Sequence, residues 1–239
     1  MPDGSRRVAG AGLAAFAAAR VPEAIRRFRP GPLPPGVLLP AIVLLGATLA
    51  LIALLVWLGA LWHGTPARYF REREPATHAS GALLFAAAAV AVLVARRAGV
   101  PSSRRFWSLA AVGFAFLALD DLLTIHEDLD RAIHALLGWD SRHWLTDHLD
   151  DAIVAAYGLV AVAWAYRHRA DILRLRWTAL LLGVAFAGFA AMTAIDFAAQ
   201  RPEIEESLKL LAEALIVIGL LAALRDPALR EPPGGRLPR

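Results

Sequence analysis

The stretch at residues 37–62 reads VLLPAIVLLGATLALIALLVWLGALW and holds no charged side chain. An α-helix needs about 20 apolar residues to cross the hydrocarbon core of a bilayer. A helix in the core of a soluble protein keeps one polar face, and this stretch has none. It therefore predicts a membrane-spanning helix.

Similar apolar blocks recur along the whole chain. We identify six that are long enough to cross a bilayer, at residues 37–62, 78–95, 106–125, 149–166, 177–198 and 207–224. Hydrophobic residues make up 58% of the 239 residues, and the mean hydropathy is +0.52, whereas soluble domains are about 45–50% apolar. We therefore expect an all-α fold, a six-transmembrane-helix bundle over residues 37–224.

The charged residues predict the orientation of this bundle. If the N-terminus is cytoplasmic, most of the 25 basic residues lie in cytoplasmic segments, while most of the 21 acids and nearly all of the 7 histidines lie at the outer ends of the helices. This is the asymmetry of the positive-inside rule. We therefore expect both termini to be cytoplasmic and the acidic face to be periplasmic or extracellular. The preference for Arg over Lys is typical of GC-rich bacterial genomes, which favours a bacterial inner (plasma) membrane.

The basic character of the chain, with a pI near 10.3, follows from this topology. Arginines beside the membrane also match anionic lipid headgroups, so the lipid bilayer is an expected partner. No aromatic interleaving or nucleic-acid-binding motif accompanies the basic residues, and we expect no nucleic acid as a partner. The absence of cysteine excludes disulfides, thiolate metal sites and cysteine nucleophiles.

The two ends of the chain differ from the bundle. Residues 1–36 combine a basic, apolar segment with the proline-rich linker PGPLPPG at 30–36. We expect an amphipathic segment on the cytoplasmic membrane surface, and the alternative is a disordered basic tail. Residues 225–239 are expected to form a cytoplasmic tail.

Polar residues gather at the outer end of the third block, where residues 117–134 read LALDDLLTIHEDLDRAIH. If the helix runs unbroken past Asp120, then Asp120, Glu127 and His134 fall on one stripe at a spacing of seven residues, with His126 stepping toward His134. Asp121 begins a second acidic stripe. Carboxylates next to hydrocarbon are costly, so we expect them to face the interior of the bundle and to have a partner.

Two other helices bring polar groups to the same depth. TDHLDD at 146–151 opens the fourth helix with Asp147, His148 and Asp151, and an Asp here also caps the helix. The last helix begins PEIEESLKLLAEA, in which Glu206 and Glu213 share a face.

Lys209, on that same face, is the only lysine of the chain. We expect it to form an ion pair with Glu205, Glu206 or Glu213 at helical spacing. A retinal Schiff base is not expected, because six spans are predicted rather than seven.

The acids on this side outnumber the basic residues, and like charges packed together repel. Three arrangements relieve the repulsion: a bound divalent cation, a proton-sharing carboxylate network, or salt bridges with water. For the first, carboxylate and imidazole ligands without sulfur suit Zn, Fe, Mn, Ca or Mg. The candidate metal ligands are Asp120, His126, Glu127, His134, Asp147, His148, Asp151 and Glu206. The chain has no Glu-x-x-His pair, so this prediction depends on clustering alone.

The segments FLALDD…IHEDLD and EESLKLLAEALIVIGLLAA resemble a group of uncharacterised bacterial polytopic membrane proteins. That group carries an acidic pair, a His-Glu or His-Asp a few residues later, and a Glu-Glu at the start of the last helix. The resemblance covers residues 106–224 and implies a fold but no reaction. The chain is more loosely similar to ceramidase-like membrane hydrolases, which hold zinc with histidines and an Asp near one membrane face. It departs from them in its six spans and in lacking paired histidines late in the sequence.

Three functions follow from these features. The first is a metal-dependent hydrolase acting on a lipid or amphiphile, in which a metal-bound water is the nucleophile and Asp121 or Glu213 is the catalytic base. The second is a non-catalytic accessory subunit or assembly factor of a larger membrane complex, with partner subunits in the membrane. The third is an ion or solute transporter, which typically has polar residues along a full crossing or broken helices near the midplane. The cytoplasmic halves of the predicted helices are almost wholly apolar and no inverted repeat is evident, which argues against a transporter.

Overall fold

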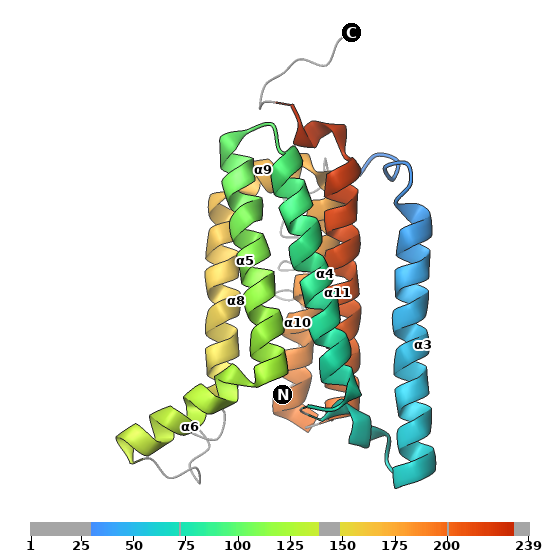
Figure 1. Ribbon diagram of the computed structural model, residues 1–239, viewed down its shortest axis with the longest axis vertical. Coiled ribbons are helices and arrows are strands. Elements are labelled where there is room, and N and C mark those ends of the chain that lie inside the picture. Colours follow the sequence, from blue (N-terminus) through green and yellow to red (C-terminus); the bar gives the residue numbers. More distant parts are fainter. Residues whose placement is uncertain (1–29, 72, 139–148, 200, 232–239) are drawn as a thin grey trace, which may run out of the picture. The chain divides into compact units, whose positions relative to one another are not determined.

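The structure is a computed structural model that describes residues 30–71, 73–138, 149–199 and 201–231. Its regular structure in these ranges is entirely helical (Figure 1). The expected all-α fold class is therefore confirmed for the described part of the chain. Most of the segment predicted over 1–36 lies outside these ranges, as does the end of the predicted tail.

Short connections join the helices, except between α6 and α8, where residues 139–148 lie outside the described ranges. In chain order they are α3 (Leu38–His63), η1 (Pro66–Phe70), α4 (Pro75–Arg97), α5 (Pro101–Leu123), α6 (Ile125–Leu137), α8 (Leu149–Arg167), α9 (Arg169–Arg174), α10 (Arg176–Ala199), α11 (Pro202–Arg225) and η2 (Pro227–Leu229). Proline opens α4, α5 and α11, where its missing N–H group costs no helical hydrogen bond.

Five of these helices, α3, α4, α5, α10 and α11, are long and apolar enough to cross a membrane. This arrangement is typical of an integral membrane protein. The apolar part of α8 is shorter, over Ala152–Arg167. Five of the six predicted spans therefore have a helix of sufficient length, and the sixth stays a prediction.

The last long helix, α11, is the centre of the bundle. It contacts α3, α4 and α10, and 61% of the residues in its most apolar part are buried, against 11% in α3 and in α10. The apolar surfaces of α3 and α10 are consequently those that a bilayer would cover. Polar residues on α11 are instead held inside the protein.

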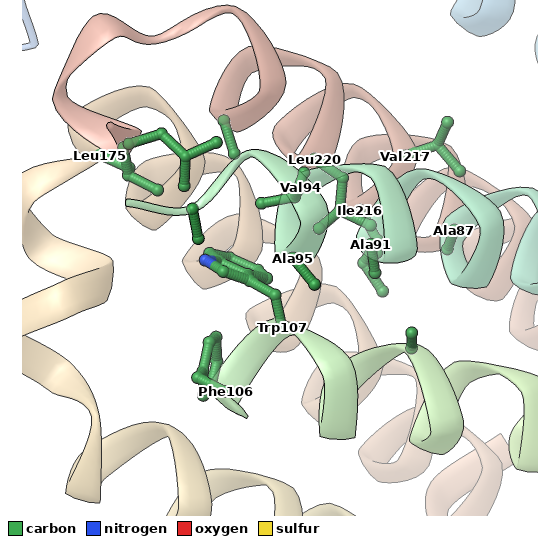
Figure 2. Close-up of a cluster of buried hydrophobic side chains, with 14 of the residues drawn as sticks. Ala87, Ala91, Val94, Ala95, Phe106, Trp107, Leu175, Ile216, Val217 and Leu220 are labelled. Carbon is green, nitrogen blue, oxygen red and sulfur yellow. The ribbon is translucent and has the colours of Figure 1, made fainter. Parts of the chain in front are cut away.

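Small residues let α4 and α11 approach each other closely. Ala87, Ala91 and Val94 of α4 face Ile216 and Leu220 of α11 in one buried cluster (Figure 2). Alanines at such a contact bring two helix backbones together, which is the usual basis of packing between membrane helices. The aromatic rings of α5 close this cluster at the end where α4 and α5 are connected. The rings of Phe106 and Trp107 are in edge-to-face contact, with 4.7 Å between their centroids.

The third predicted helix is not continuous, and that expectation is wrong. α5 ends at Leu123 and α6 begins at Ile125, with Thr124 between them in the left-handed conformation at φ 53°. Thr124 is fully buried, and its side-chain oxygen accepts a hydrogen bond of 2.9 Å from Arg73 Nη2. Because this contact fixes the break, residues on the two sides of Thr124 do not follow one helical stripe.

Candidate functional site: a buried carboxylate–lysine cluster

Three helices bring ionisable side chains together inside the bundle. Glu206, Lys209 and Glu213 lie on one face of α11, as their helical spacing requires. Asp121 reaches them from the last turn of α5, and Ser80 from the second turn of α4. We call these five residues the lysine cluster.

Lys209 is the cation at the centre of the lysine cluster. Its Nζ donates to Asp121 Oδ1 on α5 and, at 3.2 Å, to Glu206 Oε1 on its own helix. The predicted pairing with Glu206 is therefore confirmed, while the pairing with Asp121 links two helices. A charged hydrogen bond between helices is stronger than one between neutral groups and holds α5 against α11.

Glu213 is the most deeply buried acid of the cluster, with a relative exposure of 1%. Its Oε1 accepts a hydrogen bond of 2.6 Å from Ser80 Oγ, and Ser80 is itself fully buried. With a rise of about 1.5 Å per residue, Glu213 lies about 16 Å from the start of α11 and about 18 Å from its end. A carboxyl group thus sits near the middle of a helix long enough to span a membrane.

The cluster contains more negative groups than one lysine can neutralise. Asp121 and Glu206 are buried as well, with relative exposures of 8% and 7%. One oxygen of each of the three carboxyl groups (Asp121 Oδ2, Glu206 Oε2 and Glu213 Oε2) is buried without a hydrogen-bond partner among the described residues. Such oxygens are costly in a medium of low dielectric constant, and protonation or a bound cation relieves the cost.

Asp120, although adjacent to Asp121, belongs to a separate group. Its Oδ1 accepts a hydrogen bond from the backbone N–H of His126 at 3.0 Å, and its Oδ2 lies 3.0 Å from His126 Nδ1. Asp120 therefore stabilises the first turn of α6 beyond the break at Thr124. This pair is part-buried, with side-chain exposures of 6% for Asp120 and 14% for His126.

The remaining polar residues of α6 pair with one another along that helix. Arg131 forms ion pairs with Glu127 at 3.1 Å and with Asp128. The hydrogen bonds that Arg131 donates to Asp128 and Glu127 raise the pKa of Arg131, so its charge is fixed at any physiological pH. His134 Nδ1 lies 2.9 Å from Asp130 Oδ1. Contacts of this kind lie within one helix and do not reach the lysine cluster.

The structure accordingly divides the predicted metal ligands. Asp120 is placed with His126, Glu206 is in the lysine cluster, and Glu127 and His134 lie on α6. Asp147 and His148 lie outside the described residues, as does the side chain of Asp151. Within the described ranges, no three His, Asp or Glu side chains are placed to share a metal ion, and the complete ligand set stays a prediction.

The two predicted catalytic residues do lie in one cluster. Asp121 and Glu213, which come from α5 and α11, both interact with Lys209. Ser80 was not predicted, because a serine in an alanine-rich helix gives no signal by itself. The position of Ser80 opposite Glu213 depends on the register in which α4 packs against α11. The sequence pattern does not predict this register.

A family model described as "Domain of unknown function (DUF8692)" matches residues 42–224. The chain belongs to this family. Neither a curated protein nor a solved structure matches it. The comparisons agree with the predicted resemblance to an uncharacterised family, and they show no ceramidase-like similarity.

The DUF8692 region includes every residue of the lysine cluster and the break at Thr124. The cluster is therefore part of the family domain itself and does not belong to a terminal extension. It brings together three carboxyl groups, one ammonium group and one hydroxyl donor.

Proposed function

We propose that the protein is an ion-coupled membrane transport protein in which the lysine cluster takes up protons from the acidic end of the bundle. One observation carries the proposal: three buried carboxyl groups surround a single lysine, and each has an oxygen without a partner among the described residues. If all four groups were ionised, the cluster would hold a net negative charge inside the membrane. Uptake of one proton by Glu213 and a second by Glu206 removes that charge.

The proposal favours protons over a metal ion because Lys209 already lies between the carboxylates. Its ammonium group donates to both Asp121 and Glu206. A divalent cation at that position would have to displace a lysine of the same charge sign. Protons need no such rearrangement, which favours a proton site over the metal-dependent hydrolase predicted from the sequence.

The order of the groups along the bundle supports entry from one end. Asp121 lies in the last turn of α5, Lys209 in the second turn of α11, and Glu213 one turn deeper. Beyond Glu213, α11 continues as ALIVIGLLAAL with no ionisable group before Arg225. The chain of polar groups therefore stops near the middle of the helix, which is where substrate and coupling-ion sites of transporters typically lie.

The proposed topology has six crossings, with α8 as the sixth. Both termini and the arginine-rich helix ends lie on the cytoplasmic side of a bacterial inner membrane. The acidic end, including α6, then faces the periplasm or the exterior. In this orientation the protons come from outside the cell.

A pH jump on purified protein in proteoliposomes, adsorbed to a solid-supported membrane, tests proton entry without a known substrate. We expect a transient current in the wild type, because protons move part of the way across the membrane to reach the cluster. Glu213→Gln should remove most of this current. Asp128→Asn should leave it unchanged, because Asp128 is 64% exposed on α6 and, among the described residues, pairs with Arg131 of the same helix.

A second measurement keeps the test independent of the amplitude of the current. Infrared spectra of the reconstituted wild type should show a protonated carboxyl band at neutral pH that is absent in Glu213→Gln or in Glu206→Gln. Equal currents and equal carboxyl bands in the wild type and both variants would overturn the proposal.

A further inference from the structure

The opposite end of the bundle holds a pocket of different chemistry. Its volume is about 450 Å³. The lining residues are three arginines, two acids and two apolar residues: Arg97, Arg225, Arg230, Asp226, Glu231, Leu224 and Pro227. We call it the arginine pocket. Arg97 is the last residue of α4 and Arg225 the last residue of α11, so the pocket lies where two helices end side by side.

The short helix η2 fixes one wall of this pocket. Leu229 is buried in the core, and its carbonyl oxygen accepts a hydrogen bond of 3.1 Å from the backbone N–H of Gly99. A side chain at position 99 would collide with the carbonyl oxygen of Arg230, so this close approach requires glycine. The segment that carries Arg230 is therefore packed directly against the turn between α4 and α5.

The three guanidinium groups outnumber the two acids that line the pocket with them, Asp226 and Glu231. None of the three forms an ion pair within the described part of the chain, although Arg68, Arg131, Arg174 and Arg201 all do. Arg97 Nη1 donates a hydrogen bond of 3.3 Å to the carbonyl oxygen of Leu224. The nearby Asp226 uses its Oδ1 to accept from the backbone N–H of Ala228 at 2.9 Å, which caps η2.

We propose that the arginine pocket binds the phosphate group of an acidic membrane lipid such as phosphatidylglycerol. The planar guanidinium group donates two parallel hydrogen bonds to phosphate oxygens, and three such groups converge here. The volume of the pocket lies within the range of about 300–1,000 Å³ that is common for small-molecule sites. Basic pockets between the ends of membrane helices are suited to acidic lipid headgroups, and the predicted topology places this one at the cytoplasmic leaflet, which is rich in anionic lipids.

The segment that carries Arg230 forms one wall of the arginine pocket. Because this segment is fixed to the bundle, it would hold a lipid headgroup at a fixed depth. Arg174 Nη1 on α9 donates to the carbonyl oxygen of Glu231 at 2.8 Å, which ties the end of this segment to a second part of the bundle. A lipid phosphate held by Arg97, Arg225 and Arg230 would bridge α4, α11 and the segment after η2. Binding should thus stabilise the helix ends that meet at the pocket.

Native mass spectrometry of the full-length protein released from nanodiscs tests the proposal. The nanodiscs contain equal parts of phosphatidylglycerol and phosphatidylcholine, and the ratio of the two retained lipids is measured. We expect the wild type to retain phosphatidylglycerol preferentially, and we expect Arg225→Gln and Arg230→Gln each to weaken that preference about tenfold. Arg225→Lys should show an intermediate loss, because it keeps the charge but not the two-pronged hydrogen bonding.

Matched controls separate a built site from general surface charge. Arg96→Gln and Arg105→Gln remove exposed charges from the same end of the bundle without lining the pocket. Both should retain phosphatidylglycerol as the wild type does. An equal loss in the controls and in the pocket variants, or no loss in the pocket variants, would overturn the proposal.

A separate titration with inorganic phosphate identifies the source of the phosphate group. If thermal stabilisation by phosphatidylglycerol depends on Arg225 and Arg230 and inorganic phosphate has no effect, the ligand is the lipid. If inorganic phosphate alone stabilises the wild type with the same dependence on Arg225 and Arg230, the site is a phosphate site but the lipid assignment is wrong. Because no residue of the lysine cluster is changed, failure here leaves the proposed proton site untouched.

Discussion

The lysine cluster and helix α6 both contain acids from the same stretch of sequence, but these acids have different environments in the two regions. Asp121 is buried and shares Lys209 with Glu206, which belongs to another part of the chain. Six residues after Asp121, Glu127 pairs with Arg131 four positions further along one helix. Acids that are neighbours in the sequence thus separate by depth: the buried Asp121 pairs with a lysine of another helix, whereas the more exposed Glu127 pairs within its own helix.

Replacing Lys209 should cause the largest loss in the free energy of unfolding. Lys209→Met leaves three buried carboxyl groups without their cation, and breaking a buried ion pair from one side costs about 3–5 kcal/mol. Thermal unfolding in mild detergent, or titration with a denaturing detergent, measures the loss. A change as small as that of an exposed ion pair would show that the cluster is solvated.

The packing of α4 on α5 beside the cluster should be the next most sensitive feature. In Gly81→Ala the new Cβ would lie 2.7 Å from Leu122 Cγ, and Leu122 adjoins Asp121. Overpacking of this kind costs about 1–3 kcal/mol. Gly113→Ala on α5 is the control, because nothing lies within 4 Å of the added Cβ, and it should be neutral or stabilising. Equal effects of the two alanines on thermal unfolding would contradict the close approach.

The hydrogen bond to Glu213 should contribute less to the stability of the protein. A second buried serine provides a matched control. Ser80→Ala removes the donor to Glu213 Oε1 and should destabilise the protein by about 1–2 kcal/mol. Ser103 is equally buried, but its Oγ has no hydrogen-bond partner among the described residues. Ser103→Ala should therefore have little effect in the same unfolding assay, and the account of Glu213 is wrong if the order of the two variants is reversed.

The smallest effect is expected on α6. Arg131 is exposed to solvent, and its ion pairs with Glu127 and Asp128 lie within one helix. Such pairs contribute little because water screens them. Arg131→Gln should leave the unfolding midpoint and the pH-jump current unchanged. A loss of stability comparable with that of Lys209→Met would contradict this account, because it would mean that α6 and the lysine cluster are energetically coupled.

Much of the fold could be predicted because hydrophobic length is a local property. The block at residues 37–62 differs from the observed α3 by one residue at each end. The pairing of Lys209 with Glu206 could also be predicted, because two residues three apart on a helix lie on the same face.

The break at Thr124 could not be predicted, and it decides where the acids point. Its left-handed backbone is held by Arg73, which lies 51 residues earlier in the chain. Helical periodicity carries no information about such a contact. Without the break, Asp120 and Glu127 would share a stripe; with it, Asp120 caps α6 and Asp121 alone joins the cluster.

A double-mutant cycle between Asp121 on α5 and Lys209 on α11 tests the central claim most directly. The free energy of unfolding is measured for the wild type, Asp121→Asn, Lys209→Met and the double variant. If the two side chains share one buried site, Lys209→Met should cost at least about 1 kcal/mol less in the Asp121→Asn background, which lies within the coupling expected for contacting residues. Effects that add within about 0.5 kcal/mol, the usual limit for independent positions, would contradict a shared cluster between the helices.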